Sequence, residues 1–328
     1  MAFDIAVILP CYNEEAAIGA LVRGFRAALP DATIYVYDNN SKDRTAERAA
    51  EAGAVVRRET AQGKGNVVRR MFADVEADLY VLADGDGTYD PAAAPALIDR
   101  LLADNLDMVV GARTGAAGDA FRAGHRLGNR MLSGLVGWLL PNRFSDILSG
   151  YRVLSRRFVK SFPALATGFE TETELTIHAL ELRLPVGEVP IAYATRPKGS
   201  ASKLSTWRDG IRIFTVILFL FKEARPFKFF GAIAALLAIV ALILAEPVIV
   251  TYLETGLVPR LPTAVLATGV MVVAALSLMC GVILDTVSRG RREAKRMRYL
   301  AIPSPAEASG RAAVQPGERL TVRPGGQR

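Results

Sequence analysis

Cysteine and histidine are scarce in this sequence, with two of each among 328 residues. Cys11 follows the first apolar segment and Cys280 lies in a long apolar run, so the pair is poorly placed for a disulfide or a zinc site. Neither His125 nor His178 has metal-ligating residue types near it at ligand spacing. This scarcity argues against a disulfide-stabilised secreted domain and against a histidine-based metal centre.

Other signals are missing as well. The apolar run near the N-terminus, Ile5–Leu9, is too short for a secretory signal peptide and is soon followed by acidic residues. The sequence has no internal repeat. It also lacks the glycine-rich N-terminal phosphate loop of enzymes that make sugar nucleotides, which argues against a nucleotidyltransferase.

Two long stretches contain no charged side chain, Phe229–Ala245 and Pro262–Leu284. A helix needs about 20 apolar residues to cross the hydrocarbon core of a bilayer. The first stretch continues through "EPVIVTY", which places Glu246 late in the run, where a carboxylate costs less than at mid-bilayer. We expect two transmembrane helices within residues 229–285; the alternative is a pair of buried core helices.

Basic residues flank these stretches on one side only. Lys222, Arg225 and Lys228 precede the first and "SRGRREAKRMR" follows the second, whereas the connecting turn carries only Arg260. The positive-inside rule then predicts a multi-pass protein of the cell (inner) membrane with both termini cytoplasmic. The net charge of +7 fits a membrane surface, so no nucleic acid is expected. Residues 207–228 suggest an interfacial amphipathic helix, and residues 286–328 a basic, largely disordered tail.

Apolar strand-like segments alternate with helix-like segments over the first 110 or so residues. This alternation predicts an α/β fold with a mostly parallel sheet covered on both faces. Ligands of such sheets bind beyond the carboxyl ends of the strands. Asp38 and Asp84 each end a predicted strand, so we expect both in one crevice.

The second of these strands runs into two aspartates, Asp84 and Asp86, with one glycine between them. On an extended exit from the strand, both carboxylates would face the same side and approach one hard cation, Mg²⁺ or Mn²⁺. The glycine would let the backbone approach a phosphate closely. The alternative is a solvated acidic turn, because Asp-Gly-Asp-Gly is favourable turn chemistry in any protein.

Four motifs in order decide between these readings: "ILPCYNEE", "YDNNSKDRT", "GKGNVVRR" and "DGDGTYDP". Together they resemble the inverting family 2 glycosyltransferases, which have the GT-A fold, over roughly residues 3–210. The segments "DILSGYRVLSRRFV", "GFETETELTIHAL" and "RPKGSASKLSTWRDG", with the two apolar stretches, look like the polyprenyl-phosphate glycosyltransferases, relatives of dolichol-phosphate mannose synthase. The resemblance implies a catalytic domain over residues 1–206.

The resemblance also implies roles on the donor side. Asp84 and Asp86 match the family's metal-binding aspartates, but Gly87 and Thr88 stand where many relatives have leucine and glutamine. Asn39 stands where many have a second aspartate, which leaves uridine and guanosine donors open. The implied nucleotide-binding residues are Pro10, Tyr12, Glu14, Asp38 (for the base), Lys64 and Asp84, together with Arg196 and Lys203 on a loop that closes over the diphosphate.

On the acceptor side, a lipid phosphate is already largely anionic at cytoplasmic pH, because its second pKa is near ~6. It therefore needs cationic positioning more than a general base. The candidates for holding it are Arg113, Arg126, Arg130 and Ser133. Asp146 is the family's candidate base, but we favour an orienting role in a pair with Arg152. The predicted catalytic residues are Asp86, Arg130 and Asp146.

The predicted reaction is a single in-line displacement. A lipid phosphate attacks the anomeric carbon of a nucleotide diphosphate sugar, and the linkage inverts. Two alternatives remain: a processive polysaccharide synthase, although "STWRD" stands in place of a Gln-x-x-Arg-Trp motif, and a non-catalytic membrane scaffold with a nucleotide-sugar-binding fold. The expected partners are a nucleotide sugar, a polyprenyl phosphate and the membrane, and a homo-oligomer stays open.

Overall fold

The computed structural model describes residues 3–114, 144–165, 168, 171–193, 221–222 and 225–308. The chain divides into two compact units. The first comprises Met1–Arg122, Phe144–Ser202 and Met297–Arg328, and the second comprises Ala123–Arg143 and Lys203–Arg296.

The first unit consists of strands alternating with helices, as the apolar pattern predicts. Its strands are β1 (Ile5–Cys11), β2 (Thr33–Asp38), β3 (Val55–Arg58), β4 (Leu79–Leu82), β5 (Met108–Thr114), β6 (Arg152–Ser155) and β7 (Val186–Ala192). Its helices are α1 (Ile18–Ala28), α2 (Thr45–Glu51), α3 (Lys64–Asp74), the 3₁₀ turn η1 (Pro91–Ala93), α4 (Ala94–Ala103), α6 (Arg156–Ser161), α7 (Thr171–Leu182) and α11 (Pro305–Ala308).

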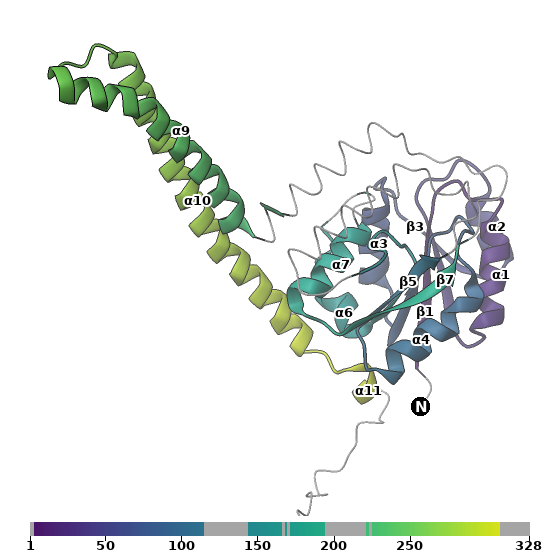
Figure 1. Ribbon diagram of the computed structural model, residues 1–328. Coiled ribbons are helices and arrows are strands. Elements are labelled where there is room, and N and C mark those ends of the chain that lie inside the picture. The colour runs from purple at the N-terminus through teal and green to yellow at the C-terminus, as the bar shows by residue number, and fades with distance from the viewer. Residues whose placement is uncertain are drawn as a thin grey trace, which may run out of the picture. The chain divides into compact units, whose positions relative to one another are not determined.

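The strands form one seven-stranded sheet in the order β3-β2-β1-β4-β6-β5-β7 (Figure 1). Strands β1 to β4 pair in parallel, as do β5 and β7. β6 runs antiparallel to both β4 and β5, between which it is inserted. The prediction of a mostly parallel sheet is therefore confirmed, with β6 as an antiparallel strand that the sequence pattern did not reveal.

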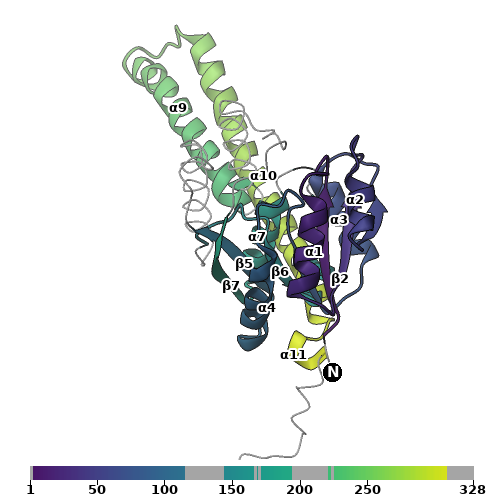
Figure 2. The ribbon, with the colours of Figure 1, turned by 90° about the vertical axis from the view of Figure 1, so that its right-hand side faces the viewer.

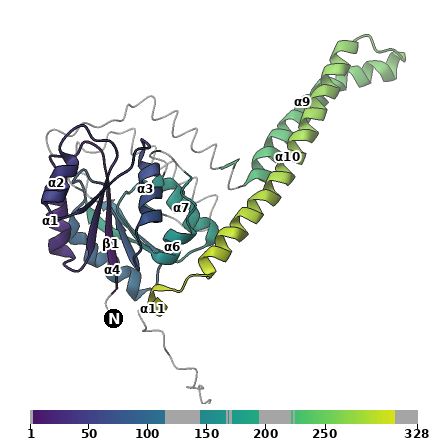
Figure 3. The ribbon, with the colours of Figure 1, turned by 180° about the vertical axis from the view of Figure 1, so that it is seen from behind.

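Helices cover both faces of the sheet (Figures 2 and 3). On one face, Leu9 of β1 lies in a core with Phe25 of α1 and Leu97 of α4. On the other, the ring of Phe72 from α3 packs edge-on against Tyr80 of β4, with 6.3 Å between the ring centres. Successive strand residues point to opposite faces, so a strand buried on both sides is apolar at nearly every position.

The second unit contains two long apolar helices, α9 (Pro226–Thr255) and most of α10 (Leu261–Leu300), joined by a short turn. They lie side by side in all three views (Figures 1–3). Apart from Pro226 at the start of α9, the buried positions of this pair are small residues seven apart: Ala234 and Ala241 on α9, and Ala267, Ala274 and Gly281 on α10. Small residues at such spacing let two helices approach closely, as in membrane proteins. Both helices are long and apolar enough to cross a membrane.

The basic segment after the apolar part of α10 is helical. Residues 286–300, the first part of the stretch predicted to be a basic, largely disordered tail, continue α10, and Pro305–Ala308 form the short helix α11. The stretch is rich in arginine, which favours helix, and Arg289 pairs with Asp285 one turn earlier at 2.8 Å. Most of the predicted interfacial helix, residues 207–220 and 223–224, lies outside the described residues, and its last three residues belong to α9.

Candidate active site

The aspartates that end two strands lie at one edge of the sheet. Asp38 is the last residue of β2, and Asp84 follows the end of β4 by two residues. β1 lies between these strands and is parallel to both, so all three present their carboxyl ends to the same side. Asp38 and Asp84 therefore lie at the same edge of the sheet, and the crevice expected to hold both stays a prediction.

The glycine between Asp84 and Asp86 has a packing role that we did not expect. A Cβ on Gly85 would lie 2.3 Å from the Cys11 sulfur and 3.1 Å from the Pro10 carbonyl oxygen. Gly85 is therefore required for packing against the end of β1, and the close approach of its backbone to a phosphate stays a prediction. The chain turns here rather than staying extended, and Gly87 adopts a φ of 72°, in the left-handed region that favours glycine.

A second glycine, Gly150, packs against the carboxylate of Asp84. A Cβ on Gly150 would lie 2.5 Å from Asp84 Oδ2. The Gly150 amide donates a hydrogen bond to the hydroxyl of Tyr89 at 2.9 Å. Asp86 is buried and accepts hydrogen bonds from the Thr88 hydroxyl at 2.6 Å and the Thr88 amide at 3.1 Å. The two aspartates are thus held in place by their own turn and by the segment that contains Gly150.

Lys64 reaches into this acidic edge from the first turn of α3. Its ammonium group donates to Asp84 Oδ1 and to Glu172 Oε1, which lies in the first turn of α7. The Lys64 side chain is 11% exposed, Glu172 8% and Asp84 30%. Burial alone would lower the pKa of Lys64, but the two carboxylates outweigh it and hold that pKa well above its usual value. Lys64 is therefore a firmly protonated, buried cation.

Asn39 sets the position of Lys64. Its side-chain amide donates to the carbonyl oxygens of Glu59 and Ala61, both at 2.9 Å, and its oxygen accepts from the Gly63 amide at 2.7 Å. An aspartate at this position could not donate to the two carbonyls. Asn39, which we connected with the choice of base, thus holds the loop that precedes α3, and no sequence pattern indicates this role.

The predicted nucleoside-binding segment is hydrogen-bonded to the segment that runs from the end of β2 to the start of α2. Asn13 accepts from the Lys42 amide at 2.8 Å and its own amide donates to the Ser41 hydroxyl at 2.9 Å, while the Glu14 amide donates to the Thr45 hydroxyl at 2.8 Å. These bonds fix the backbone at Asn13 and Glu14, directly after Tyr12 and the Pro10–Cys11 end of β1.

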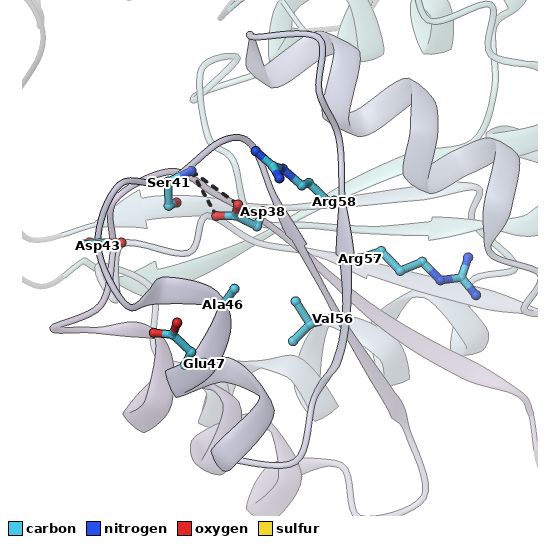
Figure 4. Close-up of a pocket in the computed structure, with 8 residues that line it drawn as sticks. All are labelled: Asp38, Ser41, Asp43, Ala46, Glu47, Val56, Arg57 and Arg58. Carbon is cyan, nitrogen blue, oxygen red and sulfur yellow. Dashed lines mark hydrogen bonds between the residues drawn. The ribbon is translucent and has the colours of Figure 1, made fainter.

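A cavity of about 330 Å³ opens beside Asp38 (Figure 4). Asp38 points into the cavity and accepts hydrogen bonds from the Ser41 amide to both carboxylate oxygens, each at 3.3 Å. The other charged residues that line it are Asp43, Glu47, Arg57 and Arg58. The cavity therefore offers hydrogen-bond acceptors and donors together. A heterocyclic ligand that has both kinds of polar atom requires such a lining.

On the acceptor side, the structure corrects the predicted pairing of Asp146. The carboxylate accepts from Nε and Nη2 of Arg113 at 2.6 and 2.8 Å, a two-point ion pair. The Arg113 guanidinium also lies over the ring of Tyr193, 5.3 Å from its centre. Arg152 instead donates to backbone oxygens in the segment after Asp146, at Ile147 (2.7 Å) and Ser149 (3.0 Å).

The electrostatics of these two arginines differ. Burial alone would lower the pKa of Arg113, but the bond to Asp146 keeps it above its usual value. Arg152 is fully buried, which lowers its pKa to about 10, so the guanidinium is still charged at neutral pH. Asp146 therefore orients Arg113, whereas Arg152 shapes the backbone that contains Asp146 and Gly150.

Comparison with known proteins shows which family the chain belongs to. Residues 6–161 match the family profile described as "Glycosyl transferase family 2". Glycosyltransferase AglJ of Haloferax volcanii is 30% identical over 299 residues, which cover 90% of this chain and 98% of that protein. The chain belongs to glycosyltransferase family 2.

Two further relatives of this glycosyltransferase are informative. A dolichyl-phosphate hexose transferase of the same archaeon is 29% identical over 211 residues, covering 64% of this chain and 90% of that protein. A solved structure of glucosyl-3-phosphoglycerate synthase from Mycobacterium tuberculosis, in complex with Mn²⁺ and uridine-diphosphate-glucose, matches with a TM-score of 0.53 and 25% identity. The match covers 67% of this chain and 79% of that one. The α/β domain of the glycosyltransferase therefore has the GT-A fold.

The acidic edge of the glycosyltransferase fits a hard divalent cation. Asp84 and Asp86 offer carboxylate oxygens, the ligands that Mg²⁺ and Mn²⁺ prefer. Within the described ranges, no three histidine, cysteine or acidic residues gather into a metal-binding group. Two carboxylates suit an ion that completes its coordination with substrate phosphates and water, as Mg²⁺ does in many phosphate-handling enzymes.

Several predicted residues of the glycosyltransferase lie outside the described residues, and their roles remain predictions. They are Arg126, Arg130, Ser133, Arg196 and Lys203. The described residues that the structure brings together are Asp84, Asp86 and Lys64 at one place, and Arg113 with Asp146 at another. Glu172, which lies within the segment "GFETETELTIHAL", is a direct partner of Lys64 in the structure.

Proposed function

We propose that this glycosyltransferase transfers one sugar from a uridine or guanosine diphosphate sugar to a polyprenyl phosphate, with inversion at the anomeric carbon. The proposal rests on one contact at the carboxyl edge of the sheet: the ammonium group of Lys64 donates to Asp84, two residues before Asp86. A buried cation next to two carboxylates suits a diphosphate that arrives with a divalent cation. A hexosyltransferase activity agrees with the family. That the acceptor is a polyprenyl phosphate is proposed in addition.

The donor would be held along the carboxyl edge of the sheet. Asp38 and the cavity beside it are suited to the base, Tyr12 and Glu14 to the nucleoside, and Lys64 to the diphosphate. A divalent cation on Asp84 and Asp86 would supply charge neutralisation of the departing diphosphate. Asp86 is prearranged for that task by Thr88, because its carboxylate is already held by two hydrogen bonds.

The acceptor would be held by cations rather than activated by a base. Arg113, oriented by Asp146 and supported by the ring of Tyr193, is suited to one side of a lipid phosphate. Arg126, Arg130 and Ser133 would complete the phosphate site. An anionic phosphate oxygen is already a nucleophile, so positioning it in line with the anomeric carbon is the main requirement. An α-linked donor would then give a β-linked product.

The choice of a lipid acceptor rests on two observations. The chain has two helices of membrane-spanning length and composition, and one relative is a dolichyl-phosphate hexose transferase. The basic residues on both sides of the helix pair favour a cytoplasmic location for the catalytic domain, residues 1–206, at the cell membrane.

Sugar transfer into lipid tests the proposal. Membranes containing the full chain are incubated with labelled UDP- and GDP-sugars, with and without EDTA, and the label is measured in organic extract, in polymer and in water. Asp86→Ala removes a proposed metal ligand, and Asp90→Ala is the matched control because Asp90 caps the 3₁₀ turn η1. We expect label in lipid that EDTA and Asp86→Ala abolish and Asp90→Ala preserves. Label in polymer would support a synthase, and no transfer from any donor would support a scaffold.

A further inference from the structure

The ammonium group of Lys64 and the proposed metal ion need the same carboxylate. Lys64 donates to Asp84 Oδ1, and Asp84 is one of the two residues suited to the ion. Of the two partners of Lys64, Asp84 is the more open, with 30% of its side chain exposed, against 8% for Glu172. A cation that enters from solvent therefore meets Asp84 first, while the contact between Lys64 and Glu172 stays deeper in the domain.

We infer that Lys64 competes with the divalent cation for Asp84, and that Glu172 retains Lys64 in the site when the metal takes Asp84. This inference rests on the proposed function. It predicts that the metal and the donor diphosphate bind with strong positive coupling: the enzyme without donor binds metal weakly, and the diphosphate makes metal binding tight.

The balance of charge explains the coupling. Without metal, the buried ammonium of Lys64 is compensated by Asp84 and Glu172 together. A metal ion on Asp84 takes away one of these partners and places a second cation nearby, and like charges at short range in a partly buried site repel strongly. A diphosphate supplies anionic oxygens between the two cations. Lys64 then exchanges Asp84 for a phosphate oxygen, and the site is again compensated.

Glu172 is placed to keep Lys64 available during this exchange. It lies in the first turn of α7, its side chain is almost fully buried, and α7 packs against α3, the helix that begins at Lys64. Its carboxylate accepts directly from the ammonium group. Glu172 is thus a positioning residue, because it acts on the diphosphate through Lys64.

Mn²⁺ binding to the full chain in detergent tests this inference. The free Mn²⁺ signal in electron paramagnetic resonance gives the affinity, with and without UDP, and no turnover is needed. Coupling between two ligands usually lies between about 5- and 150-fold. We expect UDP to tighten Mn²⁺ binding to the wild-type protein by at least roughly tenfold, which lies within that range.

Variants separate contact with Asp84 from general charge. Lys64→Met removes the competing ammonium, so Mn²⁺ without UDP should bind at least about tenfold tighter, and UDP should add little. Arg69→Met is the matched control, since it removes an exposed cation from the same helix and should leave Mn²⁺ affinity unchanged. Glu172→Gln leaves Lys64 with Asp84 alone and should weaken Mn²⁺ binding without UDP. Circular dichroism melting verifies that each variant is folded. If Lys64→Met does not fold, Glu172→Gln still tests the inference.

The outcomes distinguish this inference from the proposed function. If the wild-type protein binds Mn²⁺ without UDP as tightly as Lys64→Met does, or if Arg69→Met has the same effect as Lys64→Met, competition at Asp84 is wrong while the metal site stands. If Mn²⁺ fails to bind with UDP and also with GDP present, the metal site itself is wrong and the proposed function loses its main support. Weak binding alone, tight binding with UDP and tight binding to Lys64→Met support both.

Discussion

Gly150→Ala is a small change that should separate catalysis from stability. A Cβ at this position would lie 2.5 Å from Asp84 Oδ2 and 2.9 Å from Asp84 Cγ. Ordinary contact begins near 3.4 Å, so the carboxylate oxygen must move by roughly 0.9 Å, the difference between 3.4 and 2.5 Å. The Asp84 side chain is partly exposed and can rotate away, so the fold should tolerate the methyl group with little loss of stability.

The displaced carboxylate should nevertheless impair the reaction. A misplacement of about 1 Å in an active site can reduce the rate by about 10²-fold, or roughly 2.7 kcal/mol. We therefore expect kcat/KM for lipid glycosylation to fall between about 10- and 100-fold, with weaker Mn²⁺ binding in the presence of UDP and nearly unchanged thermal unfolding. Gly187→Ala in β7 is the matched control. Its Cβ would meet a methyl group of Leu106 at 2.7 Å, and Leu106 is not a residue of the site. Wild-type turnover and Mn²⁺ affinity in Gly150→Ala would refute the placement of Asp84 in the catalytic site.

Three other changes test separate contacts. Asn39→Asp removes two buried hydrogen-bond donors, so we expect thermal unfolding to show a loss of about 1–3 kcal/mol together with weaker UDP binding; unchanged stability would contradict the role of this side chain. Asp146→Asn weakens the ion pair with Arg113 and should raise the KM for the lipid phosphate while the pH–rate profile keeps its shape; loss of a titration step would instead make Asp146 a base. Tyr299→Phe removes the 2.8 Å hydrogen bond to the buried Asp107 and should lower stability by about 1 kcal/mol at unchanged turnover; an unchanged melting temperature would show that the bond contributes nothing.

Much of the framework was predictable from the sequence because it follows from local patterns. Apolar segments of four to seven residues alternate with amphipathic helices, and parallel strands bring their carboxyl ends together whatever the details of the loops. The shared edge of Asp38 and Asp84 follows from this rule alone. The motif that contains Lys64 was likewise sufficient to place that residue near the acidic edge.

The contacts that adjust the site could not be predicted in this way, because they join distant parts of the chain. Arg113 and Asp146 are 33 residues apart, and Lys64 and Glu172 are 108 apart, with no periodicity that relates them. β6 was missed because it is a four-residue strand that contains the buried Arg152, which looks polar in the sequence. The crowding of Gly85 by Cys11 likewise depends on the close approach of the turn to β1, which appears only in three dimensions.

The most direct test of the central claim is mass analysis of the product made by the purified full chain from its preferred nucleotide sugar and a short-chain polyprenyl phosphate with Mn²⁺. We predict a lipid phosphate that has gained one sugar, and, for an α-linked donor, a β linkage by nuclear magnetic resonance. Hydrolysis of the donor without a lipid product, addition of several sugars, or an α linkage would contradict the account.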